Sequence, residues 1–211
     1  CQPLEVAEAG VDLSQAEALT RFLNEAERPL LLIGGGGWKE VGKSALQKFA
    51  ELHSFPVSAI FRYHDLIDNN SPVYVGDAGV GMAVHLAEMI KNSDVILAIN
   101  ARLGEAATQS WSLLEAPNPR QKLIHVHASD QEIGKIYQPH LSFHAHPNQF
   151  AQFLESLEIS GKNLSQRKSW MAKGHSDYLS SLIAPSQNSP VDMAAVMKLL
   201  QERLEPDAIL T

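Results

Sequence analysis

Gly37 to Ser44 spells G-x-x-x-x-G-K-S after an apolar run, which is the spacing of the phosphate-binding loop in nucleotide hydrolases. That loop needs non-helical backbone before its lysine, so that its N–H groups converge on the anion. Here apolar residues recur at helical intervals and predict a core-facing stripe through the same segment: Val41, Ala45, Phe49 and Leu52. We therefore interpret the segment as a helix in which Lys43 faces solvent, with the hydrolase as the less favoured alternative.

The glycines from Gly34 to Gly37 close the apolar run at 29–33 and allow a tight turn without side chains. Such a turn leaves the start of the following helix open either to a diphosphate or to close packing. The third glycine of the dinucleotide fingerprint G-x-G-x-x-G is missing, because neither Lys39 nor Glu40 supplies it. An NAD- or FAD-binding oxidoreductase module is therefore an alternative with an incomplete fingerprint.

Histidines recur in two H-x-H pairs, His125 with His127 and His144 with His146. On a strand such a pair points both rings to one face, and two pairs could supply four nitrogens to zinc. No cysteine accompanies them, and nothing in the sequence brings the pairs together, so we favour histidines at the rim of a sheet. The chain also lacks a serine or cysteine elbow motif. We predict no metal ligands and no catalytic residues.

Arg102 follows the apolar run at 94–100 by two residues, where an α/β sheet presents groups to a ligand. A guanidinium suits a phosphate because its planar fork of donors matches the phosphate oxygens. The alternative is a salt bridge to a local carboxylate such as Glu105. Both interpretations stay open at this point.

The composition excludes several classes of partner. The 211 residues carry 17 Lys and Arg against 24 Asp and Glu, and 45% of them are hydrophobic. Basic residues form no cluster, which disfavours nucleic acid and anionic membranes. One cysteine excludes an internal disulfide, and no stretch approaches the roughly 18 apolar residues of a membrane-spanning helix. Since the start lacks a signal-peptide pattern, we expect a cytoplasmic globular protein.

Short apolar runs bounded by turn residues predict strands of a parallel sheet that are buried on both faces. They lie at 29–33, 55–61, 94–100 and 122–127. Amphipathic patterns predict helices at 14–27, at 80–91 and at 149–157, the first with capping-box spacing between Ser14 and Glu17. Strands that alternate with helices indicate βαβ units, so we predict a doubly wound, Rossmann-like α/β domain over residues 28–158.

The remaining segments predict connections to other domains. Residues 1–27 form a linker and a leading helix, and residues 159–190 form a helix at 167–183 followed by a linker rich in proline and serine. Residues 191–211 predict a new helix, a turn at 205–207 and the first residues of another strand. Because a domain seldom ends on an unpaired apolar strand, we expect the chain to be a fragment of a longer protein.

Four segments occur together in the order and spacing of a known domain: RPLLLIGGGG, FAELHSFPVSAIF, VGDAGVGMAVHLAEMIKNSDVILAINARL and KLIHVHASDQEIGKIYQPHLSFHAHPNQF. Over about residues 15–158 the chain resembles the central domain of thiamine diphosphate-dependent enzymes, in the branch of acetolactate synthase and pyruvate oxidase. The tail PVDMAAVMKLLQERLEPDAILT resembles the opening of the diphosphate-binding domain that follows.

The resemblance implies a parent enzyme of three α/β domains, in which the reaction occurs between the first domain of one subunit and the third of another. Such a parent is a homodimer or homotetramer. Its first domain supplies a glutamate that activates the thiazolium, and its third supplies a G-D-G…N motif that holds magnesium and the diphosphate. Neither motif is present here. The chain is thus expected to be an architectural part of a 2-keto acid carboligase or decarboxylase, inactive alone.

In some branches of this family the central domain binds FAD or ADP. In the FAD-binding members the dinucleotide lies across a glycine turn, a G-x-x-G loop and an arginine. The resemblance places the candidate cofactor site here at Gly34, Gly35, Gly36, Gly76, Asp77, Gly79 and Arg102. A second arginine of those members is missing, and His127 and His146 stand where they have acidic residues. We therefore predict a groove that binds FAD weakly or not at all.

Overall fold

The computed structural model describes residues 7–183, 185, 190–205 and 208. The chain divides into two units, residues 1–178 and 179–211, and the whole sheet belongs to the first. The second unit contains α6 (Met193–Arg203), whose first turn is capped by the Asp192 carboxylate. The strand predicted after the turn at 205–207 lies almost wholly outside the described residues, as does most of the turn itself. Within the described part of the chain, no helix is long and apolar enough to cross a membrane.

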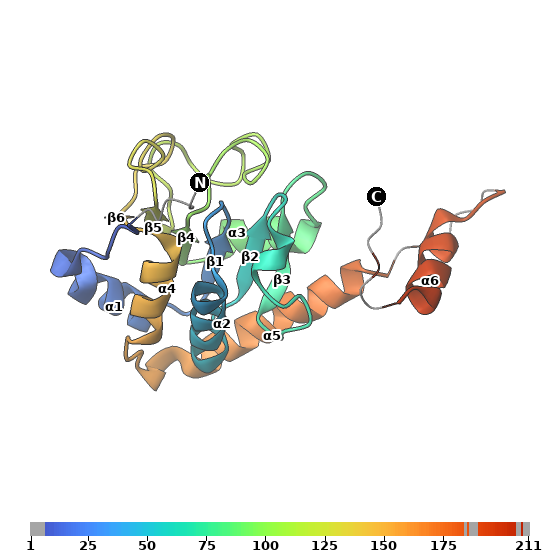
Figure 1. Cartoon of the computed structure of the whole chain (residues 1–211), viewed down its shortest axis with the longest axis horizontal. Helices are drawn as coiled ribbons and strands as arrows, with labels where there is room; N and C mark the ends of the chain where they lie inside the picture. Colours follow the sequence, from blue (N-terminus) through green and yellow to red (C-terminus); the bar gives the residue numbers. More distant parts are fainter. Residues whose placement is uncertain (1–6, 184, 186–189, 206–207, 209–211) are drawn as a thin grey trace, which may run out of the picture. The chain divides into compact units, whose positions relative to one another are not determined.

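Six parallel strands form one sheet in the order β3-β2-β1-β4-β5-β6 (Figure 1). They are β1 (Pro29–Ile33), β2 (Val57–Ile60), β3 (Tyr74–Ala78), β4 (Val95–Ile99), β5 (Lys122–His127) and β6 (Leu141–His144). The strand order reverses between β1 and β4, which are neighbours in register from Pro29 with Val95 to Ile33 with Ile99. The predicted doubly wound fold is confirmed, and its switch point lies at the carboxyl ends of these two strands.

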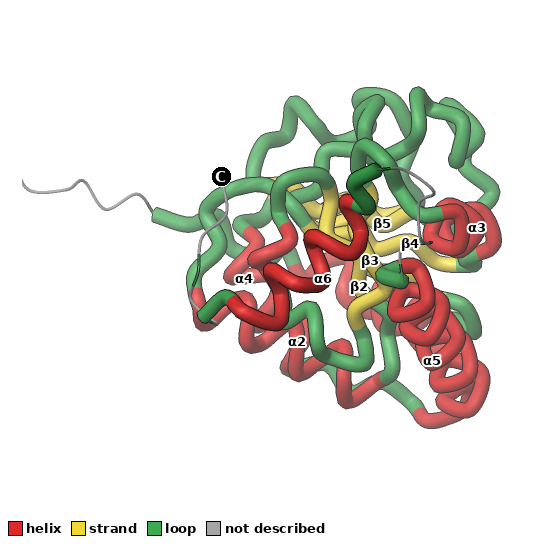
Figure 2. Tube along the Cα trace, turned by 90° about the vertical axis from the view of Figure 1, so that its right-hand side faces the viewer, coloured by secondary structure: helices red, strands yellow, loops and turns green. Residues whose placement is uncertain are grey.

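Helices cover both faces of the sheet (Figure 2). On one face lie α1 (Ala16–Glu25), α2 (Glu40–His53) and α4 (Pro147–Glu155), and on the other α3 (Val84–Asn92) with the loop after β4. Side chains of β1 alternate between the two cores, with Leu31 in the first and Leu32 in the second. The long helix α5 (Leu164–Ser181) contributes Met171 to the first core and Trp170 to the second.

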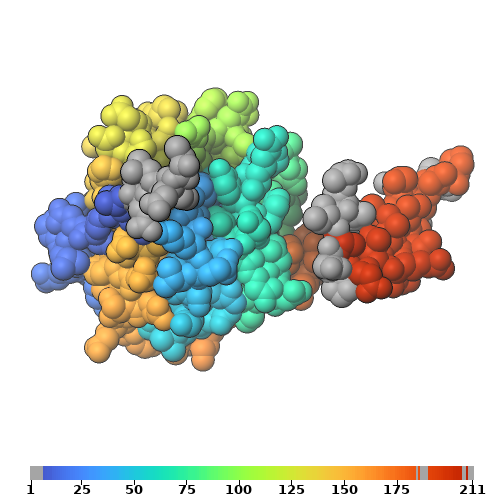
Figure 3. Space-filling model, viewed as in Figure 1, coloured from blue at the N-terminus to red at the C-terminus, as the bar shows by residue number. Residues whose placement is uncertain are grey.

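Three of the connections between strands contain no α-helix, which differs from the predicted alternation. A 3₁₀ turn, η2 (His64–Leu66), connects β2 to β3, and irregular turns connect β4 to β5 and β5 to β6. The last two loops lie side by side above the carboxyl ends of the strands, in green and yellow in Figures 1 and 3. They frame the hollows of this edge of the sheet.

The start of the leading helix differs from the predicted capping box. A 3₁₀ turn, η1 (Leu13–Gln15), comes first, and the Asp12 carboxylate accepts the Ser14 N–H at 2.9 Å. Asp12 rather than Ser14 therefore caps this segment, because its carboxylate reaches the N–H two residues ahead.

The buried face of α2 is rotated from the predicted stripe. It consists of Gly42, Ala45, Leu46, Phe49 and Ala50. Val41 and Leu52 are 53% and 73% exposed, so they were wrongly assigned to the core. The reason is that Gly42 packs directly against Asn148 of α4, and only a residue without a side chain allows the two helices to approach so closely.

Candidate ligand-binding crevice

A crevice of about 630 Å³ opens at the carboxyl ends of β1, β2, β4 and β5. It lies at the switch point of the sheet, where doubly wound folds bind their ligands. Among the predicted site residues, Gly35, Gly36 and Arg102 line it, together with His127. The remaining lining residues come from the segments after β2 and β4: Ile60, Phe61, Arg62, Tyr63, Asn100, Gly104, Glu105, Ala106 and Ala107.

The glycine turn after β1 is packed against the chain itself. A Cβ on Gly34 would overlap the Ile60 side chain, and a Cβ on Gly35, where φ is +68°, would overlap Asn100. Asn100 Nδ2 also donates a hydrogen bond to Gly36 O at 2.9 Å. Of these three glycines, only Gly36 has open space where a Cβ would be. Close packing between neighbouring strands therefore explains Gly34 and Gly35, whereas nothing packs where a side chain of Gly36 would be.

Gly76 lies inside β3, so the loop predicted from this residue onward is wrong at its start. Its φ is +115°, and the pairing of β2 with β3 shifts register nearby, between Val57 and Ala59. A glycine at such an irregularity bends the strand where other residues would be strained. Gly76 therefore shapes the edge of the sheet and does not line the crevice.

Asp77 and Gly79 also lie outside the crevice lining. Asp77 Oδ1 is 3.3 Å from His64 Nδ1, and burial raises the pKa of this carboxyl group while His64 lowers it. Gly79 packs under Phe61 and lines a smaller pocket that shares Glu105 with the crevice. The predicted set is thus divided between the crevice and the neighbouring edge of β3.

Arg102 is paired with a carboxylate from another loop. Its side chain is 70% exposed, and its Nε lies 3.2 Å from Glu132 Oε2. Glu132 pairs at the same distance with Lys135. Burial raises the pKa of Glu132, but the contacts with Lys135 and Arg102 outweigh it and hold the pKa below its ordinary value. Arg102 does form an ion pair, but its partner is Glu132, 30 residues along the chain, and not a local carboxylate such as Glu105.

His127 stands where the resemblance places an acidic residue in FAD-binding members. Its Nδ1 accepts the Ser129 N–H at 2.9 Å, and burial lowers the pKa of the ring. The same Nδ1 lies 3.2 Å from Ser129 O, so the Ser129 backbone occupies this nitrogen in either tautomer, and the neutral ring offers at most one acceptor to a ligand. A carboxylate that holds a ribose accepts hydrogen bonds from its hydroxyls. This position is unsuited to that role.

The histidine pairs do not form a metal site in the described residues, where no three His, Cys, Asp or Glu side chains could hold a metal ion together. His125 is buried, donates through Nε2 to Ala101 O at 3.2 Å, and has a pKa lowered by burial to about 4.

His146 belongs to a different cluster, at the start of α4. Its Nδ1 lies 3.5 Å from Glu8 Oε2, and the Glu8 carboxylate also contacts Lys39 Nζ at 2.8 Å. The side-chain amides of Asn148 and Gln149 each donate to Glu8 at 3.1 Å. The hydrogen bonds from Lys39 and Gln149 are the main reason that the pKa of Glu8 falls to about 2.

The start of α2 is filled by this cluster. Asn148 Oδ1 accepts the N–H of Lys39, the residue that precedes the helix, at 2.9 Å, and Asn148 Nδ2 donates to Gly37 O at 3.1 Å. Of the two outcomes that the glycine run left open, a bound diphosphate or close packing, the structure has close packing.

The hydrolase interpretation is wrong. The backbone is helical from Glu40, and Gly42 lies inside α2 against Asn148, so no loop converges on an anion here. Lys43 pairs with Glu40 and does not line the crevice. Only 24% of its side chain is exposed, which is less than the predicted solvent-facing position implies.

Sequence reasoning missed three residues that shape these sites. Asn100 holds a left-handed φ of +52° directly after β4, and an asparagine after a buried strand is a usable signal for that conformation. Glu132 lies within the segment that carried the family resemblance, but its pairing with Arg102 spans 30 residues, from 102 to 132. Glu8 lies in a segment that was interpreted only as a linker.

Comparison with known proteins identifies a family that this chain matches. The family described as thiamine pyrophosphate enzyme, central domain, matches residues 16–157. The acetolactate synthase large subunit of Corynebacterium glutamicum is 27% identical over 203 residues, covering 92% of this chain and 31% of that protein.

Two plant proteins show the same relationship. The probable acetolactate synthase 2, chloroplastic, of Oryza sativa is 30% identical over 126 residues, covering 60% of this chain and 18% of that protein. The acetolactate synthase 2, chloroplastic, of Nicotiana tabacum is 28% identical over 141 residues, covering 67% of this chain and 20% of that protein. The chain therefore spans less than a third of the length of these relatives.

Proposed function

This chain belongs to the family of thiamine pyrophosphate enzyme central domains, and from that membership we propose that it serves an acetolactate synthase-like enzyme as a scaffold. The thiamine diphosphate of such an enzyme supplies the thiazolium that attacks a 2-keto acid. The residues that hold and activate that cofactor belong to other domains of the parent protein. This chain positions those domains and performs no chemical step itself.

The observation that carries the scaffold role is the packing of the glycine turn beside the crevice by the chain's own side chains. Ile60 and Asn100 occupy the space that Gly34 and Gly35 leave, and Arg102 is paired with Glu132. A dinucleotide site needs the opposite arrangement, with exposed backbone N–H groups and an acceptor for the ribose. We therefore expect FAD to bind weakly or not at all, and ADP to find the same obstacles.

The partners in this proposal are the flanking domains of the same parent chain. We propose that residues 191–211 open the diphosphate-binding domain, and that the parent assembles as a homodimer or homotetramer in the cytoplasm. The absence of a basic cluster in the sequence leaves nucleic acid and anionic membranes as poor partners.

The experiment compares the full-length parent protein with the 211-residue chain in one assay. Both are incubated with pyruvate, thiamine diphosphate and magnesium, and acetolactate is measured after acid conversion to acetoin. We expect acetolactate from the full-length protein and none from the chain. Activity in the chain would refute the scaffold role. A full-length protein that forms no product from pyruvate or from other 2-keto acids would refute the assignment of the parent.

A further inference from the structure

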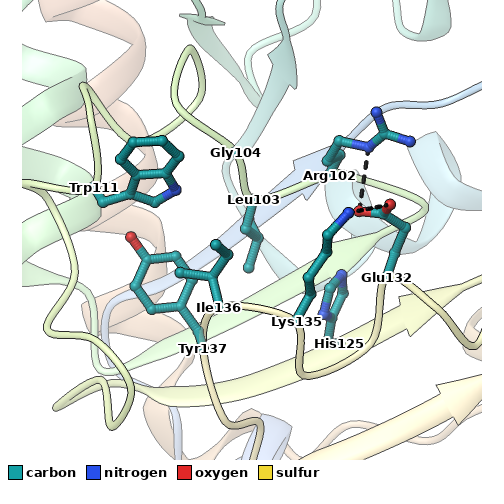
Figure 4. Close-up of a pocket in the computed structure, with 9 residues that line it drawn as sticks. All are labelled: Arg102, Leu103, Gly104, Trp111, His125, Glu132, Lys135, Ile136 and Tyr137. Carbon is teal, nitrogen blue, oxygen red and sulfur yellow. Dashed lines mark hydrogen bonds and ion pairs between the residues drawn. The ribbon is translucent and has the colours of Figure 1, made fainter.

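A second cavity, of about 160 Å³, lies beside the crevice between the loop after β4 and the loop after β5 (Figure 4). It shares only Arg102 and Gly104 with the crevice lining. We propose that this cavity binds a small carboxylate with a flat apolar body, about the size of one benzene ring. The site goes beyond the scaffold role and does not depend on the identity of the parent enzyme.

Apolar side chains form most of the cavity wall. Leu103 and Tyr137 are buried, whereas Trp111 and Ile136 are partly exposed and so lie where the cavity meets solvent. In Figure 4 the rings of Trp111 and Tyr137 lie near each other, with Leu103 and Ile136 beside them. An apolar cavity of similar volume in another protein holds a benzene molecule. The size and the lining therefore favour a compact, flat apolar group.

The hydroxyl group of Tyr137 points to a ligand with a polar atom. It is buried and forms no well-aligned hydrogen bond with the described residues, although the Thr108 hydroxyl contacts it and lowers its pKa. The nearby Thr108 hydroxyl donates its own proton to Gly104 O at 2.8 Å. Burial raises the pKa of Tyr137 more than Thr108 lowers it, so the hydroxyl remains a donor at neutral pH. Buried donors without a partner are rare in native proteins, and they commonly contact a water or a ligand.

The other side of the cavity carries a net positive charge. Arg102 and Lys135 both pair with the single carboxylate of Glu132, which leaves one positive charge in excess. In Figure 4 the terminal nitrogens of Arg102 point away from Glu132. His125 adds no charge, because its pKa is about 4. A ligand carboxylate at this side would receive charge-assisted hydrogen bonds from Arg102 and Lys135.

These features together select a ligand with polar groups at two ends. In Figure 4 the Tyr137 hydroxyl and the ion pairs of Glu132 lie on opposite sides of Leu103 and Ile136. A ring that carries a carboxylate at one end and a hydroxyl at the other matches this order. 4-Hydroxybenzoate has these groups and the right size, and we use it as the probe.

The test is a titration of ¹⁵N-labelled protein with 4-hydroxybenzoate, followed through the three tryptophan indole N–H resonances. The Trp111→Phe variant identifies the Trp111 resonance. We expect this resonance to shift with a Kd below about 1 mM, whereas the resonances of Trp38 and Trp170 stay in place. An unmoved Trp111 resonance at about 10 mM ligand, or equal shifts of all three resonances, would overturn the proposal.

Matched ligands and variants test each end of the site. We expect 4-hydroxybenzamide, the neutral analogue, to bind about tenfold more weakly than 4-hydroxybenzoate. Lys135→Gln, a substitution at an exposed side chain, should lower the affinity for 4-hydroxybenzoate by a similar factor. Tyr137→Phe should lower the affinity for 4-hydroxybenzoate more than the affinity for benzoate. Only 4-hydroxybenzoate has a hydroxyl oxygen that can accept a hydrogen bond from Tyr137. Equal affinity for the acid and the amide would overturn the proposal, as would equal effects of Tyr137→Phe on both acids.

Discussion

The parallel strands all begin at one side of the sheet and all end at the other, here called the amino edge and the carboxyl edge. These two sides are built in opposite ways. At the amino edge, Arg167 is completely buried, and its guanidinium donates to the backbone oxygens of His53, Ala26 and Ser160 at 3.0, 3.4 and 3.1 Å. The same group lies over the Phe55 ring, 5.4 Å from its centre. The guanidinium of Arg167 is thus paired within the chain.

The carboxyl edge has hollows and backbone in unusual conformations. Asn100 and Arg62 hold left-handed φ values of +52° and +73°, and the two cavities open between the loops there. Arg102 at this edge is mostly exposed and has one carboxylate partner. The comparison teaches that the amino edge holds the fold together, whereas the carboxyl edge remains adaptable for ligands.

Substitution of Arg167 and Arg102 should show the largest difference in stability between the two edges. Arg167→Ala removes the donor of three carbonyl oxygens, one of them buried, and removes packing on Phe55, so we expect the free energy of unfolding to fall by about 3–5 kcal/mol. Arg102→Ala removes a mostly exposed ion pair and should lower it by less than about 1 kcal/mol. Urea unfolding of both variants measures the contrast. Equal losses would show that the two edges do not differ in this way.

Two neighbouring glycines provide a finer comparison within the carboxyl edge. Gly35→Ala places a Cβ against Asn100 on a left-handed backbone, and we expect a loss of about 2–4 kcal/mol. Gly36→Ala meets open space and should change the free energy of unfolding by less than about 1 kcal/mol. The same urea series measures both. A Gly36→Ala loss as large as that of Gly35→Ala would mean that both glycines are packed.

The sequence predicted the central strands because their signal is local. PLLLI and KLIHVH are continuous apolar runs, and β1 and β5 match them residue for residue. The edge strands β3 and β6 were missed because an edge strand needs less apolar sequence. YVGDA contains Gly76 and Asp77, which disfavour a strand by propensity, yet pairing with β2 forms one.

The candidate site was predicted in position but not in detail. Gly35, Gly36 and Arg102 do meet at the switch point, because the fold alone places strand ends there. Their partners could not be derived, since Asn100 is 65 residues from Gly35 and the contact depends on strand order. For the same reason the sequence predicted a helix containing Arg167 but gave no sign of its three carbonyl partners.

Glu8 is an exception at the carboxyl edge, because its carboxylate has several partners there. Its pKa of about 2 lies below the ordinary 4.5, so its contribution to stability is present above pH 4.5 and is lost as the pH falls toward 2. We expect Glu8→Gln to lower the free energy of unfolding by about 1 kcal/mol at neutral pH, a modest value because solvent screens the cluster.

Urea unfolding of the wild type and Glu8→Gln at several pH values tests this assignment. The difference between the two proteins should shrink as the pH falls below 4.5, because the folded wild type then begins to lose the charge that the variant never had. The groups that face Glu8 are Lys39, His146, Asn148 and Gln149, and both proteins retain them. A difference that stays constant down to pH 2 would contradict the role of the Glu8 charge.

The central claim is that the chain packs the glycine turn of its crevice with its own side chains and pairs Arg102 with Glu132, so that FAD is not held there, and a flavin-fluorescence titration with FAD tests it most directly. Purified protein should be colourless, and FAD fluorescence should show no saturable change below about 100 μM protein. Arg102→Ala should behave as the wild type does in this range. A dissociation constant below about 1 μM that Arg102→Ala abolishes would contradict the claim and establish a working FAD site.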